Sequence, residues 1–502
     1  MRSVYDVAQV RRSEEAVMAD LPDGALMDRA ATGLADTVAG LLRDLGLPIA
    51  GARAVLLIGS GNNGGDALFA GARLAARGMR VAAIMTADRC HDQGLSAFVA
   101  AGGVVARNPE EEIRRADLVI DGLVGIGGRG ALRDLGATCA EWAQRSGALV
   151  IAADIPSGVD ADTGAVADRD AVVNADVTVT FGCLKPGLVL SPGRDFAGAT
   201  VVVDIGLGDR LPPPRVQVLD DADLAMAVPE PGAQDYKYSR GVVGIAAGSP
   251  AYRGAAFMAT GSARHGNVGM VHVLDRADGL AQSLVDEFWD IVISTQAPAS
   301  VPRVTAWAVG PGLGVDLDGQ RVLVDVLGAG VPVVVDADAL RMLRESGPSA
   351  ALAARRHPTV LTPHIGEFAA LGFDCGTGAQ EDRLGAARHA AAALGAVVVL
   401  KGAGTVVASP SGVAYVDGFA TADLGTAGSG DVLAGLTGAL LAGAAARGAV
   451  DDDAVALVAA SAVGLHGIAG RIAAHGGRPV TAPDIIAALP EAIAEVRRGG
   501  RS

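Results

Sequence analysis

Short apolar runs without internal polar residues recur along the first half of the chain, and stretches with helical spacing follow them. Continuous runs of this kind are typical of strands that are covered on both faces, as in a parallel sheet. The run Ala54–Ile58 ends at Gly59, and Gly65–Arg77 then has apolar residues at helical spacing. Ala25–Leu45 has the pattern of an amphipathic helix. The further strands predicted in this half are Val81–Met85, Leu118–Ile120, Leu149–Ala153, Val177–Phe181 and Val201–Ile205.

The pattern is interrupted at Leu211, which three prolines follow. Consecutive prolines cannot continue a helix or a central strand, so we predict domains over residues 1–212 and 235–502, with a linker over 213–234. The alternation of strands and helices in both halves predicts the α/β class with parallel sheets. The elements predicted in the second half are the strands Val242–Ala246, Val268–Val273, Ala306–Val309, Val331–Val335, Thr359–Leu361 and Val397–Leu400, a hairpin of Thr405–Ala408 with Val413–Val416, and the helices Asp431–Arg447 and Asp453–Ala473.

Composition and charge narrow the classes of function. Half of the 502 residues are hydrophobic and the apolar runs recur throughout, which argues against extended disorder. The net charge of −15 argues against a general binder of nucleic acid or of anionic membranes, since both need a basic surface. We see no signal peptide, no uninterrupted apolar run of membrane-spanning length and no C-x-x-C pair among the four cysteines. We therefore expect a cytoplasmic protein without a membrane or nucleic-acid partner.

The sequence Gly59-Ser-Gly-Asn-Asn-Gly-Gly-Asp66 connects a predicted strand to a predicted helix. Ligands of α/β proteins bind at this kind of junction. Glycines let the backbone approach an anion closely, and the N-terminus of a helix favours negative charge. The spacing matches neither the dinucleotide fingerprint nor the Walker loop. A tight turn needs fewer glycines, so we interpret this segment as a ligand loop.

Two further strand ends in this half have acidic and small residues, at Asp121–Gly130 and at Asp154–Gly164. The carboxyl ends of parallel strands meet at one edge of a sheet, so Asp121, Asn63 and Ser157 could form an oxygen cage for a hard cation. Asp154 could exchange a proton with a substrate. Each aspartate alone is more often a cap or turn residue, and three such turns together favour a site.

In the second half, Thr426-Ala-Gly-Ser-Gly-Asp431 precedes a long helix and leaves backbone N–H groups free to converge on an anion. Asp431 could accept a proton from a substrate hydroxyl, or be only a favourable charge in the first helical turn. Lys401-Gly-Ala-Gly-Thr405 could contact a diphosphate, or be an ordinary turn with a solvated lysine. His364 could contact substrate, although a lone histidine is more often a hydrogen-bonded turn residue.

The motifs GSGNNGGD, DGLVGIGGRG, DIPSGVDADTG and TFGCLKPG resemble those of the epimerase domain of the bifunctional NAD(P)H-hydrate repair enzymes, over residues 1–210. The resemblance implies a Rossmann-like parallel-sheet domain with K⁺ bound by Asn63, Asp121 and Ser157, and with a catalytic, substrate-contacting acid at Asp154. The other substrate-binding residues that it implies are Asn62, Asn63, Gly64, Gly65 and Asp66 of the first loop, and Gly125, Ile126, Gly127, Gly128, Arg129, Gly130 and Ala131 of a phosphate loop. Two residues depart from the family pattern: Ala67 replaces a frequent glycine, and Ile126 replaces the usual threonine and removes a hydroxyl that could contact phosphate.

The motifs LTPHIGE, KGAGT and AGSGDVLAG resemble those of the ADP-dependent NAD(P)H-hydrate dehydratase domain, which is ribokinase-like, over residues 235–495. The resemblance implies ADP as co-substrate, Mg²⁺ in this domain, and Asp431 as catalytic residue in contact with the hydrate. It implies further hydrate contacts at Ala255, Gly314 and His364, and an adenine nucleotide held by Lys401, Gly402, Ala403, Gly404, Thr405 and Gly430. Ile365 stands where the family usually has proline, which loosens a turn.

The implied activity is the repair of hydrated nicotinamide nucleotides, NADHX and NADPHX. One half would interconvert the R and S epimers, and the other would dehydrate the S epimer with ADP, giving AMP and phosphate. The alternatives are a ribokinase-like kinase of a small molecule in the second half and a non-catalytic nucleotide-binding module in the first. We expect a homo-oligomer, although alanine-rich helices suit packing within one chain equally.

Overall fold

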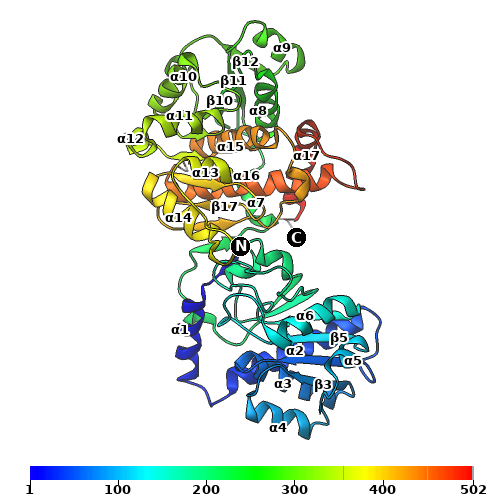
Figure 1. Ribbon diagram of the computed structural model, residues 1–502. Helices are drawn as coiled ribbons and strands as arrows, with labels where there is room; N and C mark the ends of the chain where they lie inside the picture. Colours follow the sequence, from blue (N-terminus) through cyan, green and yellow to red (C-terminus); the bar gives the residue numbers. More distant parts are fainter. Residues whose placement is uncertain (354, 449, 500–502) are drawn as a thin grey trace. The chain divides into compact units, whose positions relative to one another are not determined.

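The computed structural model describes residues 1–353, 355–448 and 450–499 (Figure 1). The chain divides into two compact units. The N-terminal unit consists of Ser3–Arg215 and Gly376–Asp382. The C-terminal unit consists of Met1–Arg2, Val216–Cys375 and Arg383–Ser502. Both units have central, mainly parallel sheets, so the predicted α/β class is confirmed.

The N-terminal unit has a seven-stranded, entirely parallel sheet with strand order β4-β3-β2-β5-β6-β7-β8. Its strands are β2 (Arg53–Ile58), β3 (Arg80–Met85), β4 (Val104–Val105), β5 (Leu118–Gly122), β6 (Leu149–Ala153), β7 (Val177–Phe181) and β8 (Ala199–Val203). Its helices are α1 (Val7–Met18), α2 (Ala25–Asp44), α3 (Asn62–Ala76), α4 (Asp92–Ala100), α5 (Pro109–Arg114) and α6 (Asp134–Ser146), with short 3₁₀ turns at Pro186–Leu188, Gly193–Phe196 and Gly208–Arg210.

The side chains of β2 point alternately into two hydrophobic cores, one on each face of the sheet. Leu56 and Ile58 belong to a hydrophobic core with residues of α1, α2 and α3, whereas Val55 and Leu57 belong to a second core with residues of α5 and α6. A strand with apolar side chains on both faces needs helices on both sides. The continuous apolar runs of the sequence follow directly from this arrangement.

The C-terminal unit has an eleven-stranded sheet with strand order β1-β9-β18-β17-β16-β15-β14-β13-β10-β11-β12. The strands from β12 to β16 are parallel, and the pairs β16–β17 and β17–β18 are antiparallel. The strands are β1 (Arg2–Val4), β9 (Val216–Val218), β10 (Val242–Ala246), β11 (Met270–Leu274), β12 (Ile291–Ser294), β13 (Ala306–Val309), β14 (Val333–Val335), β15 (Thr359–Leu361), β16 (Val397–Leu400), β17 (Val406–Ala408) and β18 (Ala414–Val416).

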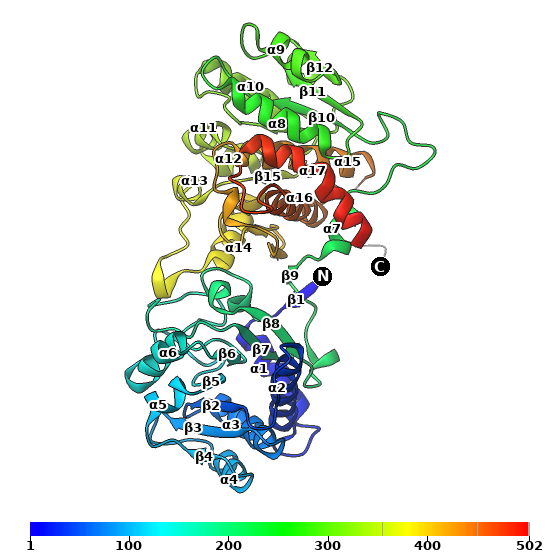
Figure 2. The same cartoon turned by 90° about the vertical axis from the view of Figure 1, so that its right-hand side faces the viewer.

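The helices of this unit are α7 (Asp221–Ala227), α8 (Arg253–His265), α9 (Leu280–Glu287), α10 (Leu317–Gly328), α11 (Asp338–Ser346), α12 (Pro348–Ala353), α13 (Ile365–Ala370), α14 (Arg383–Leu394), α15 (Ser429–Ala446), α16 (Asp452–Ala473) and α17 (Ala482–Gly499). Short 3₁₀ turns lie at Pro298–Ser300 and Ala422–Leu424, and a further one at Gly378–Gln380 belongs to the N-terminal unit. α16 packs against α15 and α17 (Figure 2). By length and composition α15 and α16 could each cross a membrane, but 78% of the most apolar 18-residue window of each is buried inside the protein, as in core helices.

Several predicted boundaries differ from the structure by one to three residues. α3 begins at Asn62 rather than at Gly65, and β8 lies two residues before the predicted strand. Residues 213–234, predicted as a linker, contain β9, which pairs with β18, and α7, which packs on α17. The prolines at 212–214 end one series of elements as expected, but the chain enters the next sheet immediately after them.

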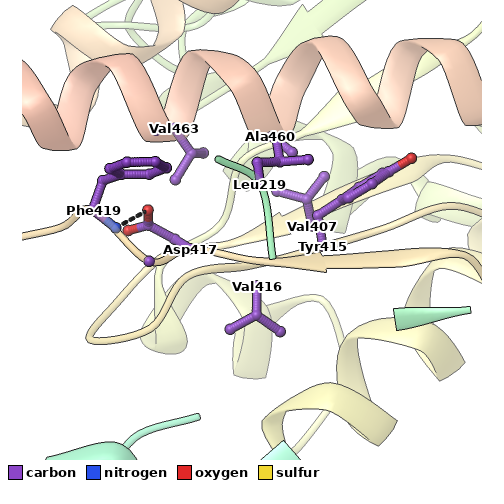
Figure 3. A pocket seen from close by; sticks show the side chains of 10 residues that line it. Leu219, Val407, Tyr415, Val416, Asp417, Phe419, Ala460 and Val463 are labelled. Atoms are coloured by element: carbon purple, nitrogen blue, oxygen red, sulfur yellow. Dashed lines mark hydrogen bonds between the residues drawn. The ribbon is translucent and has the colours of Figure 1, made fainter. Parts of the chain in front are cut away.

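α16 packs closely on the β17–β18 hairpin, as Figure 3 shows. Ala460 and Val463 of the helix and Val407 and Tyr415 of the hairpin surround a cavity of about 10 Å³. Such a volume has room for about one water molecule. This contact is therefore part of the core rather than a ligand site.

Candidate active sites

The predicted ligand loop of the N-terminal unit lies where the strand order reverses. β2 lies between β3 and β5, and ligands of doubly wound sheets bind at the carboxyl ends of such strands. Gly59 follows β2, and a Cβ atom there would collide with the carbonyl oxygen of Leu123. Asn62–Asp66 form the first turn of α3. The N–H groups at such a helix end lack partners within the helix and favour an anion.

Asp121, at the end of β5, is fully buried and bonded to Ser157. Its Oδ1 accepts a hydrogen bond from Ser157 Oγ at 2.7 Å and from Leu123 N at 3.1 Å, and its Oδ2 accepts from Ser157 N at 2.8 Å. Burial raises the pKa of Asp121 to about 6, against the lowering effect of these hydrogen bonds. A buried carboxyl group of this kind would be stabilised in its charged form by a cation.

Asn63 is buried as well, and its Nδ2 is without a partner among the described residues. Its side chain lies against Gly125, since a Cβ atom at that position would be 3.2 Å from Asn63 Oδ1. The residue before Gly125 is Val124, whose carbonyl oxygen accepts from Ser157 Oγ at 3.1 Å. Asn63, Asp121 and Ser157 thus surround one short segment after β5. Their amide, carboxyl and hydroxyl oxygens suit a hard cation.

The predicted phosphate loop, Gly125–Ala131, follows β5 as a partly exposed turn in which Gly128 N donates to Gly125 O at 2.9 Å. Ile126 packs against the core of the unit. The isoleucine that replaces the family's usual threonine therefore contributes to packing, and any phosphate contact here must come from backbone N–H groups and neighbouring side chains.

Two guanidinium groups lie at this loop. Arg129 exposes 81% of its side chain and lies 3.8 Å from Asp160 Oδ2. Arg11 of α1 lies against Gly127, where a Cβ atom would be 3.3 Å from its Nη2. Arginine pairs well with phosphate oxygens. Sequence reasoning missed Arg11, because nothing in the local pattern of α1 indicates that this helix reaches the loop.

Asp154 follows β6 and has a backbone φ of 67°, a region that residues with side chains seldom adopt. Its Oδ1 accepts from Lys185 Nζ at 2.6 Å and from Thr180 Oγ1 at 3.1 Å. The side chain of Lys185 is 1% exposed and that of Asp154 is 10% exposed. Sequence reasoning missed Lys185, although it lies in the quoted motif TFGCLKPG, because lysine is rarely buried.

A cavity of about 760 Å³ adjoins the first turn of α3, with Asn62, Asp66, Glu14, His91, Phe181 and Ile205 among its lining residues. Burial, followed by the charge of Asp154, raises the pKa of Asp66 well above its usual range, and the same two causes raise the pKa of Glu14. The volume is that of a small-molecule site. Of the predicted epimerase residues, Asn62 and Asp66 line it directly.

In the C-terminal unit the strand order reverses between β10 and β13, and a cavity of about 440 Å³ opens near their carboxyl ends. Ala255, Gly312, Asp338 and Asp431 are among its lining residues. Gly314, another predicted hydrate contact, donates its N–H to Asp338 Oδ2 at 3.0 Å. Ala255 and Asp431, which are 176 positions apart in the sequence, thus share one cavity.

Asp431 lies in the first turn of α15. Burial, with a smaller contribution from the charge of Asp336, raises the pKa of Asp431 to about 6, against the lowering effect of Lys401. Among the hydrogen bonds of the described residues, the N–H groups of Gly430 and Asp431 have no acceptor. Two free N–H groups and a carboxyl group whose pKa is about 6 therefore lie together at the N-terminal end of this helix.

Lys401, after β16, points to the same helix end. Its Nζ is 2.7 Å from Asp336 Oδ1 and 3.9 Å from Glu367 Oε2, and a Cβ atom at Gly430 would lie 3.4 Å from it. Asp336 Oδ1 also accepts from Thr362 Oγ1 at 2.7 Å. Burial lowers the pKa of Lys401, but the two carboxylates outweigh this effect and the pKa is raised, which keeps the ammonium charged.

The remaining predicted nucleotide residues form a tight turn after Lys401. Gly402 and Gly404 have φ values of 151° and 66°, which glycine adopts without strain. Thr405 Oγ1 donates to Gly402 O at 3.0 Å. Arg383, the first residue of α14, donates from Nη2 to the carbonyl oxygen of Lys401 at 3.2 Å and so stabilises the turn.

His364 is the N-cap of α13, where its Nδ1 accepts from Gly366 N at 3.0 Å and from Glu367 N at 3.2 Å. This is the hydrogen-bonded role that the sequence left open beside substrate contact. A β-bridge joins His364 to Lys401, so the histidine lies next to the nucleotide turn. Ile365 begins the helix and is half exposed.

A buried pair of side chains lies at the N-terminal end of α15. Ser429 Oγ lies 3.2 Å from His466 Nε2 of α16. Burial lowers the pKa of His466 to about 4, so the ring is neutral near pH 7. A neutral ring can exchange one hydrogen bond with the hydroxyl group and add no charge next to the free N–H groups.

Comparison with known proteins assigns both units to families. Residues 243–491 match the family model described as NAD(P)H-hydrate dehydratase, and residues 23–187 match the model described as YjeF-related protein N-terminus. The curated bifunctional NAD(P)H-hydrate repair enzyme of Mycobacterium tuberculosis is 44% identical, over 88% of this chain and 89% of its own length. That of Corynebacterium glutamicum is 33% identical, over 99% of both chains.

Among solved structures, the ADP/ATP-dependent NAD(P)H-hydrate dehydratase of Bacillus subtilis, co-crystallised with ATP and Mg²⁺, is 27% identical and has a TM-score of 0.48; the match covers 56% of this chain and 99% of that one. A ribokinase-like superfamily protein of Enterococcus faecalis is 23% identical with a TM-score of 0.49, over 56% of this chain and 96% of that one. The resemblance inferred from the motifs is confirmed by the family models and the curated relatives. The chain belongs to the family of bifunctional NAD(P)H-hydrate repair enzymes.

Proposed function

We propose that the chain repairs NADHX and NADPHX in two steps. The N-terminal unit interconverts the R and S epimers of the hydrate. The C-terminal unit dehydrates the S epimer with ADP as phosphoryl donor. The main support for the second step is the arrangement of Asp431, Lys401 and the free N–H groups of Gly430 and Asp431 around one helix end beside a cavity of about 440 Å³.

Dehydration needs a better leaving group than hydroxide. Asp431 takes the proton of the ring hydroxyl, whose oxygen then attacks the terminal phosphorus of ADP, and AMP leaves. The free N–H groups and Lys401 stabilise the charge that develops on the transferring phosphoryl group. The lone pair of the ring nitrogen then expels phosphate and leaves an iminium ion, and loss of a proton from the adjacent ring carbon to the departing phosphate or to solvent restores the double bond of the reduced nicotinamide ring.

The nucleotide would lie against the turn Lys401–Thr405 and Gly430. Asp338, whose carboxyl group lines the same cavity, would hold Mg²⁺ together with the phosphates, since this ion usually takes one or two carboxylates and phosphate oxygens. When bound, Mg²⁺ would offset phosphate charge. Asp336 is engaged with Lys401 and keeps that ammonium group in place.

In the N-terminal unit, Asp154 would take a proton from the hydrate and return it during epimerisation. The nucleotide would occupy the cavity of about 760 Å³ and extend to the phosphate loop Gly125–Ala131. Asn63, Asp121 and Ser157 would hold K⁺. This ion would supply positive charge near the phosphate groups when bound.

The test of the whole proposal is recovery of the reduced ring from a mixture of R and S hydrate. The protein is incubated with the mixture, Mg²⁺, K⁺ and either ADP or ATP, and the absorbance of the reduced ring and the release of phosphate are followed. Full recovery with ADP, with stoichiometric release of AMP and phosphate, supports the proposal. A stable phosphorylated product would instead indicate a small-molecule kinase.

We expect dehydration to depend on pH around the raised pKa of Asp431. The carboxylate is the active form, so kcat/KM for the hydrate should be constant above about pH 7 and should fall about tenfold per unit well below pH 6. The measurement is kcat/KM at several pH values with ADP and Mg²⁺ saturating. A profile flat down to pH 5 would contradict the role of Asp431 as base.

We expect Asn63→Ala to raise the K⁺ concentration needed for half-maximal epimerisation by about tenfold or more, by analogy with the loss of metal affinity when partners around a metal site are removed. Because Asn63 Nδ2 has no partner among the described residues, removal of the amide breaks no bond from that atom. The assay titrates K⁺ against a background of tetramethylammonium. Dehydration by the same variant is the control. An unchanged K⁺ titration would remove Asn63 from the cation site.

The identity of ADP rather than ATP as donor, the cytoplasmic location and the homo-oligomeric state stay predictions.

A further inference from the structure

Lys185, between β7 and the turn Pro186–Leu188, is a buried cation that the proposed chemistry does not use. Its Nζ donates to Asp154 Oδ1 at 2.6 Å, to Phe181 O at 2.8 Å and to Thr180 Oγ1 at 2.9 Å. An ammonium group has three hydrogens to donate. All three bonds are made within the protein, and the side chain is 1% exposed. Lys185 therefore has no donor left for a substrate and acts on the site through its neighbours.

The carboxyl group of Asp154 is held at one oxygen only. Oδ1 accepts from Lys185, from Thr180 Oγ1 at 3.1 Å and from Phe181 N at 3.4 Å. Among the hydrogen bonds of the described residues, none reaches Oδ2. The backbone is fixed too, because Asp154 N donates to Val179 O at 2.8 Å. One oxygen is anchored and the other stays free to exchange a proton.

Three acidic groups lie close enough for the charge of Asp154 to act on them. Glu14 comes from α1, Asp66 from the first turn of α3, and the thiol of Cys183 from the segment after β7. Ionisation of any of them would disfavour the charged form of Asp154. Lys185 is the cation in direct contact with Asp154 in the part of the chain that the structure describes.

We propose that Lys185 is a positioning residue of the epimerase site, which supplies the positive charge in contact with Asp154 and fixes Oδ1 so that Oδ2 faces the hydrate. The inference rests on the proposed role of Asp154 in epimerisation and extends it to the group that makes that role possible. Buried ion pairs of this kind need good geometry and further hydrogen bonds, and Thr180 and Phe181 provide them.

The test is the pH profile of epimerisation in Lys185→Met. Removal of the cation leaves the buried Asp154 carboxylate beside other acids without a partner of opposite charge, which disfavours its charged form. We expect the epimerisation rate at pH 7 to fall about 100-fold, as for a displaced or wrongly protonated catalytic group, and to recover in part as pH rises. A merely structural loss would lower the rate at all pH values alike.

Two controls accompany this variant. Dehydration of the pure S epimer with ADP reports on the C-terminal unit of the same chain and should not change. Lys237→Met removes an exposed lysine and should leave the epimerisation profile as it is. Asp154→Asn distinguishes the proposed catalytic role of Asp154 from the positioning role of Lys185. If Asp154→Asn epimerises normally, the proposed function fails; if it is inactive and Lys185→Met is normal, only the present inference fails.

Folding of the variants is checked by circular dichroism and thermal unfolding. If Lys185→Met unfolds, Lys185→Gln, which keeps a donor to Asp154 but no charge, is expected to fold and to show the same shift to higher pH. If both unfold, the double variant Lys185→Met/Asp154→Asn, which has no unpaired buried charge, is expected to fold. Unfolding of the double variant, or a pH-independent loss in a folded single variant, overturns the proposal.

Discussion

Asp431→Asn is expected to abolish dehydration of the S epimer while epimerisation continues. The substitution keeps the size of the side chain and its place in the first turn of α15, but it removes the proton acceptor. General-base catalysis by a positioned carboxylate contributes about 100- to 10 000-fold, and we expect a loss of that order in kcat. The measurement is release of phosphate and recovery of the reduced ring from pure S hydrate with ADP.

The matched control for this variant is Asp452→Asn. Asp452 also lies in the first turn of a long helix, α16, and burial raises its pKa as well. The two changes remove the same group from similar helix positions, and only Asp431 lines the cavity of about 440 Å³. Binding of ADP, measured separately, should change little in Asp431→Asn. Dehydration at more than a few per cent of the parental rate would refute the role of Asp431.

Asp154→Asn is expected to stop epimerisation without affecting dehydration. From a mixture of epimers, the variant should restore only the fraction present as the S form, and the R form should remain. Asparagine is chosen because it tolerates the left-handed backbone at φ 67°, whereas alanine would add strain to the loss of the carboxylate. We expect the epimerisation rate, after subtraction of spontaneous exchange, to fall by about 100-fold or more.

Asp134→Asn is the control for backbone conformation. Asp134 also has a positive φ, of 50°, but it is exposed at the start of α6. A normal epimerisation rate in this variant shows that an amide at a left-handed position does not by itself disturb the unit. Complete and rapid repair of an R and S mixture by Asp154→Asn would remove that residue from the mechanism.

Most strands of both sheets follow from the sequence alone. Runs such as Ala54–Ile58 and Val397–Leu400 are apolar at every position, because central parallel strands are covered on both faces. Elements without a clear apolar pattern are not predicted in this way. β4 and β12 are edge strands with exposed residues, and the short helices α5, α12 and α13 have too few turns for a clear period. β9 follows prolines, and its partner β18 is distant in the sequence.

The candidate site residues were predicted in separate strand-end segments, because glycines and aspartates after apolar runs are visible in a sequence. The side chains that contact those residues in the folded protein were not predicted. Lys185 is a lysine in a short loop, Arg11 lies on an ordinary helix face, and Asp336, in a turn after a predicted strand, has no sequence feature that pairs it with Lys401. Each becomes significant only through the atom that it contacts.

The sequence by itself determined the α/β class, most strand positions and the segments rich in glycine and aspartate, since these depend on local apolar pattern and on backbone freedom. Only the tertiary structure decided which acid lies beside which base. In the folded protein Lys185 forms an ion pair with Asp154 and Lys401 forms one with Asp336. Among the hydrogen bonds of the described residues, the N–H groups of Gly430 and Asp431 have no acceptor. Burial and charge pairing depend on distances between segments far apart in the chain, and a linear pattern does not contain those distances.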